Sequence, residues 1–453
     1  RKPAALTAAA GSPTLAAHPT NPGGTSAMSG PERIEVSRLG DGRRPSPIRL
    51  TTQFGDGMAN YVPDTAAVRW RLEVGSGADA PEWLFELAGP RERIFFDPAR
   101  TRAVILTCGG LCPGLNTVIR SLVLELHHHY GVREIFGGQY GYQGLAPSFG
   151  HAFLKLTPAF VDYIHQAGGT VLGTSRGEQD IGIMADTLQR ERFDLLFCIG
   201  GDGTLRGAAR IAEELRRRGA PIAVVGIPKT IDNDIPFVSP SFGYATAVEH
   251  AARVVTGAHM EARSVFNGVG LVKLMGRDAG FIACGAVLAS QEVNYALIPE
   301  TPIVWDGERG FLESLRRRLS ARRHAVVVVA EGVARQGTDG GTAPTDIGPW
   351  LKERIARHCR ERGTPVDIKY MDPSYYIRSV PANAMDNLLC DQMARAAAHA
   401  AMAGRSGVVI GRVHNLCVHV PMARIAAESK RVDPEGELWR SVLASTGQPH
   451  RWD

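Results

Sequence analysis

The feature that most constrains this chain is a series of short, continuous apolar runs that alternate with helical stretches from about residue 100 onward. A run that is apolar throughout, instead of at every second position, predicts a strand that is buried on both faces. Strands of this kind separated by helices indicate parallel sheets covered by helices. The predicted strands are 103–107, 194–199, 221–227, 268–274, 325–330 and 407–410, and the predicted helices are 114–129, 204–217, 244–261 and 383–403.

The chain has room for more than one domain of this α/β class, because it holds 453 residues and domains usually hold ~100–200. Residues 1–50 are rich in Ala, Gly, Pro, Ser and Thr, which predicts a disordered tail. An organelle-targeting peptide has a similar composition, so both interpretations stay open. Residues 51–97 contain spaced aromatic residues, and we expect an ordered extension that packs on the body. Residues 426–453 form a C-terminal segment.

Charge and cysteine content argue against several classes of function. The 51 basic and 46 acidic residues give a net charge of +5, which is too small and dispersed to indicate a nucleic-acid partner. The seven cysteines form no CxxC pair and are odd in number, which favours neither a zinc ribbon nor a complete set of disulfides. A reducing cytoplasm is therefore the expected compartment. No apolar run approaches the ~20 residues that span a bilayer, so no membrane partner is expected.

Two glycine-rich loops follow predicted strands. Residues 108–116 come after the first strand and contain Gly110, and glycines in such a loop let the backbone approach a phosphate closely. A simple strand-to-helix turn is the alternative for that loop. Residues 200–204 follow the second strand and place Asp202 among glycines, where a carboxylate can hold a magnesium ion that bridges two phosphates. A helix N-cap is the alternative role for Asp202.

A third motif, residues 228–234, follows the strand at 221–227 and contains Lys229, Thr230 and Asp232. The segments 109–116, 200–204, 228–234, 275–277, 331–332 and 372–378 occur in the order and spacing of the phosphofructokinase family. The similarity covers roughly residues 80–425. Within the family, the chain resembles the branch that contains plant and trypanosomatid ATP-dependent enzymes together with many bacterial relatives. In that branch Lys229 replaces a glycine of the commoner bacterial motif.

This resemblance implies a glycolytic activity, the transfer of the terminal phosphate of ATP to the 1-hydroxyl of fructose 6-phosphate with the help of Mg²⁺. It also implies two similar three-layer α/β/α domains with mainly parallel sheets and a cleft between them. The first domain, 98–240, would bind the nucleotide and be completed by part of 379–425. The second, 241–378, would bind the sugar phosphate. A cytoplasmic, allosteric homotetramer or homodimer is expected.

The resemblance also assigns roles to single residues. Asp232 matches the general base that accepts the proton of the sugar hydroxyl, although a structural aspartate in a polar turn is the alternative. Lys229 would offset charge on the transferring phosphate. Tyr142 resembles a tyrosine near the nucleotide and is equally consistent with a packing residue. The residues expected to bind ATP are Gly110, Arg176, Gly177, Gly201, Asp202, Gly203 and Thr204, with Asp202 also on the metal. Those expected to bind the sugar phosphate are Thr230, Ile231, Asp232, Met275, Gly276, Arg277, Glu331, Tyr375 and Arg378.

Two positions, Gly203 and Gly268, bear on alternative functions of the chain. Pyrophosphate-dependent relatives typically carry an aspartate where this chain has Gly203, so Gly203 favours ATP, while Lys229 is shared with the pyrophosphate users. The common bacterial enzymes place an arginine, which reaches a neighbouring subunit's substrate, seven residues before Met275, where this chain has Gly268. A pyrophosphate-dependent phosphofructokinase is therefore one alternative. A catalytically silent regulatory subunit is another.

Overall fold

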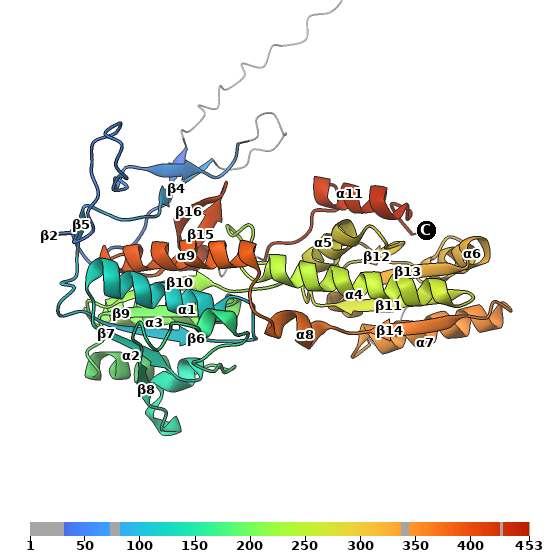
Figure 1. Ribbon diagram of the computed structural model, residues 1–453, viewed down its shortest axis with the longest axis horizontal. Helices are drawn as coiled ribbons and strands as arrows, with labels where there is room; N and C mark the ends of the chain where they lie inside the picture. Colours follow the sequence, from blue (N-terminus) through green and yellow to red (C-terminus); the bar gives the residue numbers. More distant parts are fainter. Residues whose placement is uncertain (1–30, 73–81, 337–343, 426–428, 453) are drawn as a thin grey trace, which may run out of the picture.

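The computed structural model describes residues 31–72, 82–336, 344–425 and 429–452. Two large sheets lie one after the other along the long axis of the molecule, each covered by helices (Figure 1). The predicted α/β class, with two three-layer domains and mainly parallel sheets, is confirmed. The strand that we predicted at 268–274 has the same bounds in the structure, and the other predicted strands each coincide with an observed one within a few residues.

The first sheet has the strand order β1-β4-β16-β15-β10-β9-β6-β7-β8, with β3 paired to β4. Its five central strands run parallel, from β15 to β7. Every residue of β9 and β10 is buried, as expected for strands covered on both faces. The strands are β1 (Glu32–Arg33), β3 (Ala67–Arg69), β4 (Trp83–Leu87), β6 (Arg102–Thr107), β7 (Glu134–Gly138), β8 (Phe153–Lys155), β9 (Leu195–Gly200), β10 (Ala223–Pro228), β15 (Val408–Val413) and β16 (Leu416–Pro421).

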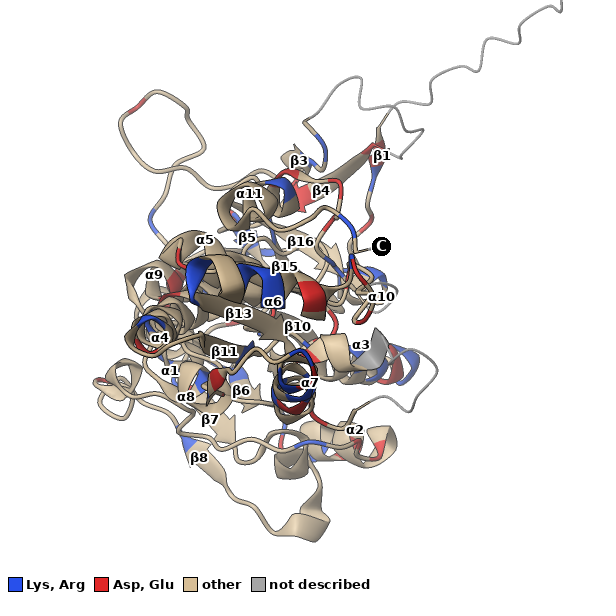
Figure 2. Ribbon diagram, turned by 90° about the vertical axis from the view of Figure 1, so that its right-hand side faces the viewer, with Lys and Arg blue, Asp and Glu red and all other residues tan. Residues whose placement is uncertain are grey.

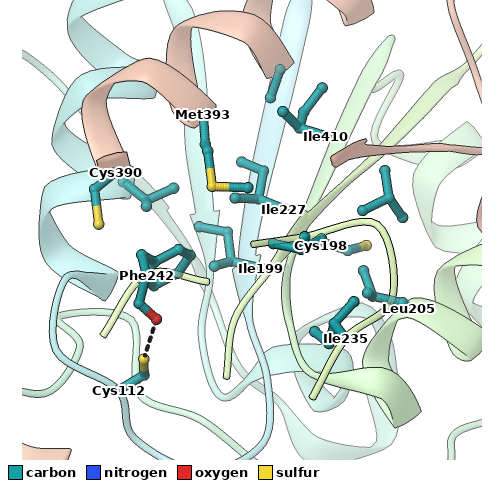
Figure 3. Close-up of a cluster of buried hydrophobic side chains, with 14 of the residues drawn as sticks. Cys112, Cys198, Ile199, Leu205, Ile227, Ile235, Phe242, Cys390, Met393 and Ile410 are labelled. Atoms are coloured by element: carbon teal, nitrogen blue, oxygen red, sulfur yellow. Dashed lines mark hydrogen bonds between the residues drawn. The ribbon is translucent and has the colours of Figure 1, made fainter. Parts of the chain in front are cut away.

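Helices cover both faces of this sheet. One layer contains α1 (Leu115–Leu124) and α9 (Ala384–Met402), which pack against each other, and the other contains α2 (Ile181–Arg190) and α3 (Asp202–Arg217). A π-helical turn, Glu125–Tyr130, extends α1. In the core, Ile199 and Ile227 lie below Met393 of α9, whereas Cys198 lies toward Leu205 of α3 (Figure 3). Adjacent residues of one strand therefore serve opposite helix layers.

The second sheet is wholly parallel, with the order β12-β13-β11-β14. Successive residues of β11 face different cores: Val272 belongs to the cluster under α4 and α5, and Leu271 to the cluster under α6 and α7. Looking along the long axis, α4 and α9 lie on one side of β10, β11 and β13, and α3 and α7 on the other (Figure 2). The elements are α4 (Tyr244–Ser264), β11 (Gly268–Leu274), α5 (Phe281–Ser290), β12 (Tyr295–Leu297), α6 (Phe311–Arg322), β13 (His324–Ala330), α7 (Ile347–Glu361) and β14 (Asp367–Met371).

Three segments connect the two sheets. Helix α4 leads into the second sheet, and α8 (Ser374–Ser379) leads back to α9. After α10 (Met422–Ile425) the chain returns to the second sheet, where α11 (Glu437–Thr446) packs against α5 and Trp452 joins the core of α6 and α7. Among the described residues, no helix is both long and apolar enough to cross a membrane.

The prediction of a disordered tail over residues 1–50 is wrong for residues 31–50. β1 pairs with β4, and β2 (Arg44–Pro45) pairs with β5 (Arg93–Ile94). Ile34 is buried in the main core, and Arg38 forms ion pairs with Asp64 and Glu86. These anchors are single residues in a segment without apolar periodicity, which is why the composition did not reveal them. Residues 1–30 lie outside the described part of the chain.

Gly268 begins β11 against the end of α4. A Cβ at this position would lie 2.1 Å from the Ala262 carbonyl oxygen and 2.7 Å from Cγ2 of Val265. The Ala262 carbonyl belongs to the backbone of α4, so it could make room for this Cβ only if the helix itself moved. An arginine at this position, as in the common bacterial enzymes, is therefore incompatible with this packing.

Candidate active site

A cavity of about 410 Å³ opens at the carboxyl ends of β6, β9 and β10. Ligands of open α/β sheets collect at this edge. Lys229 follows β10 and reaches the cavity, and so does Arg277, which follows β11 of the second sheet, so the cavity lies where the two domains face each other. All seven residues predicted to bind ATP line it: Gly110, Arg176, Gly177, Gly201, Asp202, Gly203 and Thr204.

Helix α3 begins at the cavity. Gly201 is its N-cap and provides no side-chain cap, so the first backbone N–H groups of the helix face a site suited to an anion. The glycines here differ in how tightly they are enclosed. A Cβ at Gly200 would lie 2.3 Å from Oγ1 of Thr204, whereas a Cβ at Gly203 would meet only Nη2 of Arg206, at 4.0 Å. Space beside Gly203 is therefore open toward the cavity.

Cationic side chains surround the same space. The Lys229 ammonium is buried and donates a hydrogen bond of 2.5 Å to the carbonyl oxygen of Gly110, and burial lowers its pKa. Arg176, Arg206, Arg210 and Arg277 also line the cavity. Guanidinium and ammonium groups gathered around a helix N-terminus suit a polyphosphate ligand.

Asp202 is half exposed and forms an ion pair with Arg206. No cluster of three or more His, Cys, Asp or Glu side chains able to hold a metal occurs in the described ranges. A metal ion bound here would take one carboxylate from the protein and its other ligands from phosphate and water. Magnesium accepts this arrangement, because it keeps several waters and commonly binds one or two carboxylates together with substrate phosphates. The residues present therefore fit Mg²⁺ bound with a nucleotide.

The loop after β10 is shaped by side chains other than Asp232. The Thr230 hydroxyl donates to Oδ1 of Asp234 over 2.8 Å and accepts from the backbone N–H of Asp232 over 3.1 Å. Asn233 has a left-handed φ of 56°, and its Oδ1 accepts from the backbone N–H of Ser241 over 3.0 Å. Since Thr230 and Asn233 form the turn, the Asp232 side chain is not needed to form it.

The Asp232 carboxylate is directed toward the second domain. Its Oδ1 is buried and has no hydrogen-bond partner among the described residues. Burial raises the pKa of Asp232 to about 7, and the charges of Asp234 and Glu331 add to the rise; a hydrogen bond from the backbone of Arg277 and the charge of Lys229 oppose it. A buried carboxyl with a pKa near neutrality and a free oxygen has the properties of a general base.

Three of the residues predicted to bind the sugar phosphate, Arg277, Glu331 and Arg378, belong to the second domain and lie near this carboxylate. The backbone N–H of Gly332 donates to the carbonyl oxygen of Gly276 over 3.1 Å, which joins the loops after β13 and β11. Burial raises the pKa of Glu331, and the charges of Arg277 and Arg378 lower it. These contacts bring Asp232, Arg277, Glu331 and Arg378 into one group.

Three other residues predicted to bind the sugar phosphate, Ile231, Met275 and Tyr375, have less side chain available for contact with a ligand or lie further out. Ile231 is buried in the core, so only its backbone is available to a ligand. Met275 is partly buried and packs against the same core. Tyr375 is 78% exposed, and its ring lies under the Arg378 guanidinium, with 4.6 Å from the carbon of that group to the ring centroid. Tyr375 is therefore open to solvent.

Sequence reasoning left the role of Tyr142 open and missed several residues of the cavity wall. Tyr142 does both: it lines the cavity, packs at Gly207 and donates a hydrogen bond of 2.6 Å to the carbonyl oxygen of Thr204. Arg206 and Arg210 follow Asp202 at intervals of four on α3, so helical periodicity could have revealed them. The lining residues for which no role was predicted are Cys108, Gly109, Ser175, Glu178, Gln179, Ile181, Met184, Arg206, Gly207 and Arg210.

The chain was compared with known proteins. A protein of Borreliella burgdorferi named ATP-dependent 6-phosphofructokinase is 43% identical, over 92% of this chain and 97% of its own length. A protein of the same name from Trypanosoma cruzi is 43% identical, over 92% of this chain and 88% of its own. ATP-dependent 6-phosphofructokinase 7 of Arabidopsis thaliana is 44% identical, over 82% and 78%.

Solved structures share the fold. A pyrophosphate-dependent phosphofructokinase from Marinobacter aquaeolei matches with a TM-score of 0.65 and 18% identity, over 77% of this chain and 91% of that one. Pichia pastoris phosphofructokinase matches with a TM-score of 0.62 and 22% identity, over 82% and 40%. The family model described as Phosphofructokinase matches residues 102–401. This chain belongs to the phosphofructokinase family.

Proposed function

We propose that this chain is an ATP-dependent 6-phosphofructokinase, which transfers the terminal phosphate of ATP to the 1-hydroxyl of fructose 6-phosphate and so acts in glycolysis. One observation carries the proposal. The Asp232 carboxylate, whose Oδ1 has no hydrogen-bond partner among the described residues, interacts with the charge of Lys229, which lines the cavity, and with the charge of Glu331 in the second domain. A donor site and an acceptor site thus share one proton acceptor.

In this mechanism Asp232 receives the proton of the 1-hydroxyl as its oxygen bonds to phosphorus. Phosphoryl transfer passes through a loose transition state, so positioning and charge stabilisation supply most of the catalysis. The buried Lys229 ammonium, fixed by Gly110, is a preorganised positive charge beside the transferring group. A magnesium ion, held by Asp202 and phosphate oxygens, would neutralise charge on the donor phosphates.

The sugar phosphate is proposed to bind on the second domain. Arg378 and Arg277 would grip its phosphate, because a guanidinium donates two hydrogen bonds at once. Glu331 would accept hydrogen bonds from sugar hydroxyls. The loop at Met275 and Gly276, the loop at Thr230 and Ile231, and the exposed ring of Tyr375 would complete the wall.

Two features favour ATP over pyrophosphate. The open space beside Gly203 leaves room for an α-phosphate. The cavity also continues past the phosphate-binding glycines to the apolar side chains of Ile181 and Met184. A volume of about 410 Å³ lies in the range of ~300–1,000 Å³ typical of sites for drug-sized ligands. Pyrophosphate would leave the apolar end unfilled, whereas a nucleoside would cover it.

The organisation of the protein is part of the same proposal. Residues 98–240, with part of 379–425, form the nucleotide-binding domain, residues 241–378 form the sugar-phosphate-binding domain, and 51–97 is an extension that packs on the body. The assembly is a cytoplasmic homotetramer or homodimer under allosteric control. The pairing of β3 with β4, and of β4 with β16 of the main sheet, supports the place of the extension.

The proposal is tested by measuring fructose 1,6-bisphosphate formation by the purified chain with magnesium and saturating fructose 6-phosphate. ATP and pyrophosphate are supplied in separate titrations, and the Asp232→Ala variant gives the background. We expect turnover with ATP and not with pyrophosphate. Turnover with pyrophosphate alone would reverse the donor assignment. A folded, ligand-binding protein without turnover with either donor would instead be a regulatory subunit.

A further inference from the structure

The described segment between α10 and α11, residues 429–436, contacts the loop that carries Asp232. The Lys430 ammonium donates hydrogen bonds to Oδ1 of Asn233 over 3.0 Å and to the carbonyl oxygen of Val238 over 2.7 Å. The backbone N–H of Lys430 donates to the carbonyl oxygen of Asp234 over 2.8 Å. One residue of the C-terminal segment therefore holds the loop at three points, Asn233, Asp234 and Val238.

Asn233 is the residue through which this contact reaches the proposed base. It is the direct neighbour of Asp232, it is buried, and it has a left-handed backbone. Asparagine is one of the few residues other than glycine that adopt this conformation, because its short polar side chain can hydrogen-bond locally. The Asn233 side chain is fixed from two directions, by the Lys430 ammonium and by the backbone N–H of Ser241.

The same segment is also tied to the second domain. The backbone N–H of Val432 donates to Oε1 of Glu300 over 2.9 Å, and the Glu300 carboxylate accepts from the backbone N–H of Gly280 at the start of α5. The Lys430 ammonium lies 5.1 Å from the centroid of the Phe281 ring, the first residue of that helix. Lys430 thus stands between the acceptor loop of one domain and helix α5 of the other.

The setting of this ammonium is unusual for a lysine in a purely structural contact. Its hydrogen bonds to Asn233 and Val238 go to uncharged oxygens, and among the described residues the charge of Asp234 favours the ammonium form. Burial lowers the pKa of Lys430 to about 8. Burying a charge is costly in free energy unless the charge is paired or hydrogen-bonded. The Lys430 ammonium therefore depends on its hydrogen bonds to Asn233 and Val238.

We infer that Lys430 is a positioning residue for phosphoryl transfer: it fixes Asn233, and through Asn233 it keeps the adjacent Asp232 in the orientation that receives the acceptor proton. This inference rests on the proposed function, since it assigns Lys430 a part only if Asp232 is the base. Lys430 itself lies outside the cavity that the donor occupies. Since it acts through Asn233 on the proposed base, its effect should appear mainly in turnover.

The test compares four forms of the full chain in the ATP assay: wild type, Lys430→Met, Lys430→Arg and Arg431→Met. Lys430→Met keeps an unbranched side chain and removes the ammonium. Arg431→Met removes a positive charge from the exposed neighbouring residue and is the matched control. We expect Lys430→Met to lower kcat by about 10–100-fold, because a misplacement of 1 Å costs on the order of 10² in rate. The KM values for ATP and fructose 6-phosphate should stay within about threefold of wild type, Arg431→Met should keep wild-type kcat, and Lys430→Arg should recover part of the loss.

Two results would overturn the inference. One is a wild-type kcat in Lys430→Met, and the other is a loss of kcat that merely follows the folded fraction measured by thermal melting. If Lys430→Met does not fold, Lys430→Gln, which keeps a hydrogen-bond donor without the charge, replaces it under the same criteria. Absence of ATP turnover in wild type would instead overturn the proposed function. An active wild type with an unimpaired Lys430 variant would remove this inference alone.

Discussion

Arg176 and Arg378 reach the same glycine from opposite sides of the site. A Cβ at Gly110 would lie 3.4 Å from Nη2 of Arg176 and 3.4 Å from Nη1 of Arg378. Arg176 lines the proposed donor cavity, whereas Arg378 belongs to α8, between the two domains. Two like charges held this close favour negatively charged ligands beside them.

The two arginines should differ in which substrate they affect. Arg378→Ala should raise the KM for fructose 6-phosphate by about 10–150-fold, the effect of losing a charge-assisted contact of ~1.5–3 kcal/mol. Arg176→Ala should raise the KM for ATP by a similar factor. Steady-state titration of each substrate at saturation of the other measures both. A rise confined to the KM for ATP in Arg378→Ala would contradict our division of the site.

Asp232→Ala should lower kcat by ~10²–10⁴-fold, which is the usual contribution of a positioned general base. Smaller changes are expected in the KM for either substrate, since the carboxylate acts on the proton and not on binding. Asn233→Ala is a useful comparison, because it changes the adjacent residue and leaves the carboxylate. Turnover near wild type in Asp232→Ala would remove Asp232 from the mechanism.

The pH dependence of kcat/KM should show an acidic limb. The pKa of Asp232 is raised to about 7, so the carboxyl is protonated and unable to accept a proton below that pH, and the rate should fall as the pH falls through about 7. Asp234 contributes to the raised pKa. Asp234→Asn keeps an oxygen that can accept from Thr230 and removes the charge, so it should move the limb to lower pH. The phosphate groups of the substrates titrate in the same way with wild type and with Asp234→Asn, so they cannot cause a difference between the two pH profiles. An acidic limb at the same pH in both enzymes would show that the pKa of Asp232 does not set this limb.

Gly203→Asp tests the choice of donor. The new side chain fits, because a Cβ there meets only the end of Arg206 at 4.0 Å, and its carboxylate would enter the space proposed for the α-phosphate. Activity with ATP should fall by at least ~10²-fold, since a like-charge contact in such a site costs several kcal/mol. Donor titrations with saturating fructose 6-phosphate and magnesium measure the effect, with Gly203→Asn as the uncharged control. Unchanged kinetics with ATP would show that Gly203 does not determine the donor, and a pyrophosphate-dependent enzyme would again be a serious alternative.

Gly268 and Gly257 should respond to alanine in opposite directions. A Cβ at Gly268 would overlap the backbone of Ala262, so Gly268→Ala should lower the free energy of unfolding by about 1–3 kcal/mol. Gly257 lies on the exposed face of α4 with no atom within 4 Å of its would-be Cβ, so Gly257→Ala should raise it by ~0.5–1 kcal/mol. Thermal melting of both variants at equal concentration provides the check. Equal melting temperatures would show that the end of α4 is free to shift.

The sequence predicted much of the fold because its central strands are buried on both faces. Val269 to Leu274 are all apolar except Lys273, and such a run has few other structures open to it. The donor loops were also predictable, because glycine is required where backbone must approach a ligand or a neighbouring side chain. Gly200 is such a position, because a Cβ there would lie 2.3 Å from Oγ1 of Thr204.

Other parts were not predictable, for physical reasons. β1 and β2 have two residues each, too few for any periodicity, so residues 31–50 resembled a tail. Lys430 and Asn233, which are in contact, lie 197 residues apart in the sequence. A local sequence pattern cannot predict a contact between residues so far apart. The role of Thr230 in shaping the loop depends on distances that residue types alone do not determine.

The strand order of the first sheet has a consequence for synthesis on the ribosome. β10 gains its neighbour β15 only late, as the hydrogen bond between Ser406 and Val224, residues 182 apart, illustrates. At ~5–20 residues per second, translation leaves that edge of β10 open for about 10–35 s. Meanwhile β11 to β14 emerge in full and can pair with one another. The nascent chain therefore carries a nearly finished second domain beside an apolar strand edge that is open to wrong partners, and delay or truncation before residue 408 would prolong that exposure.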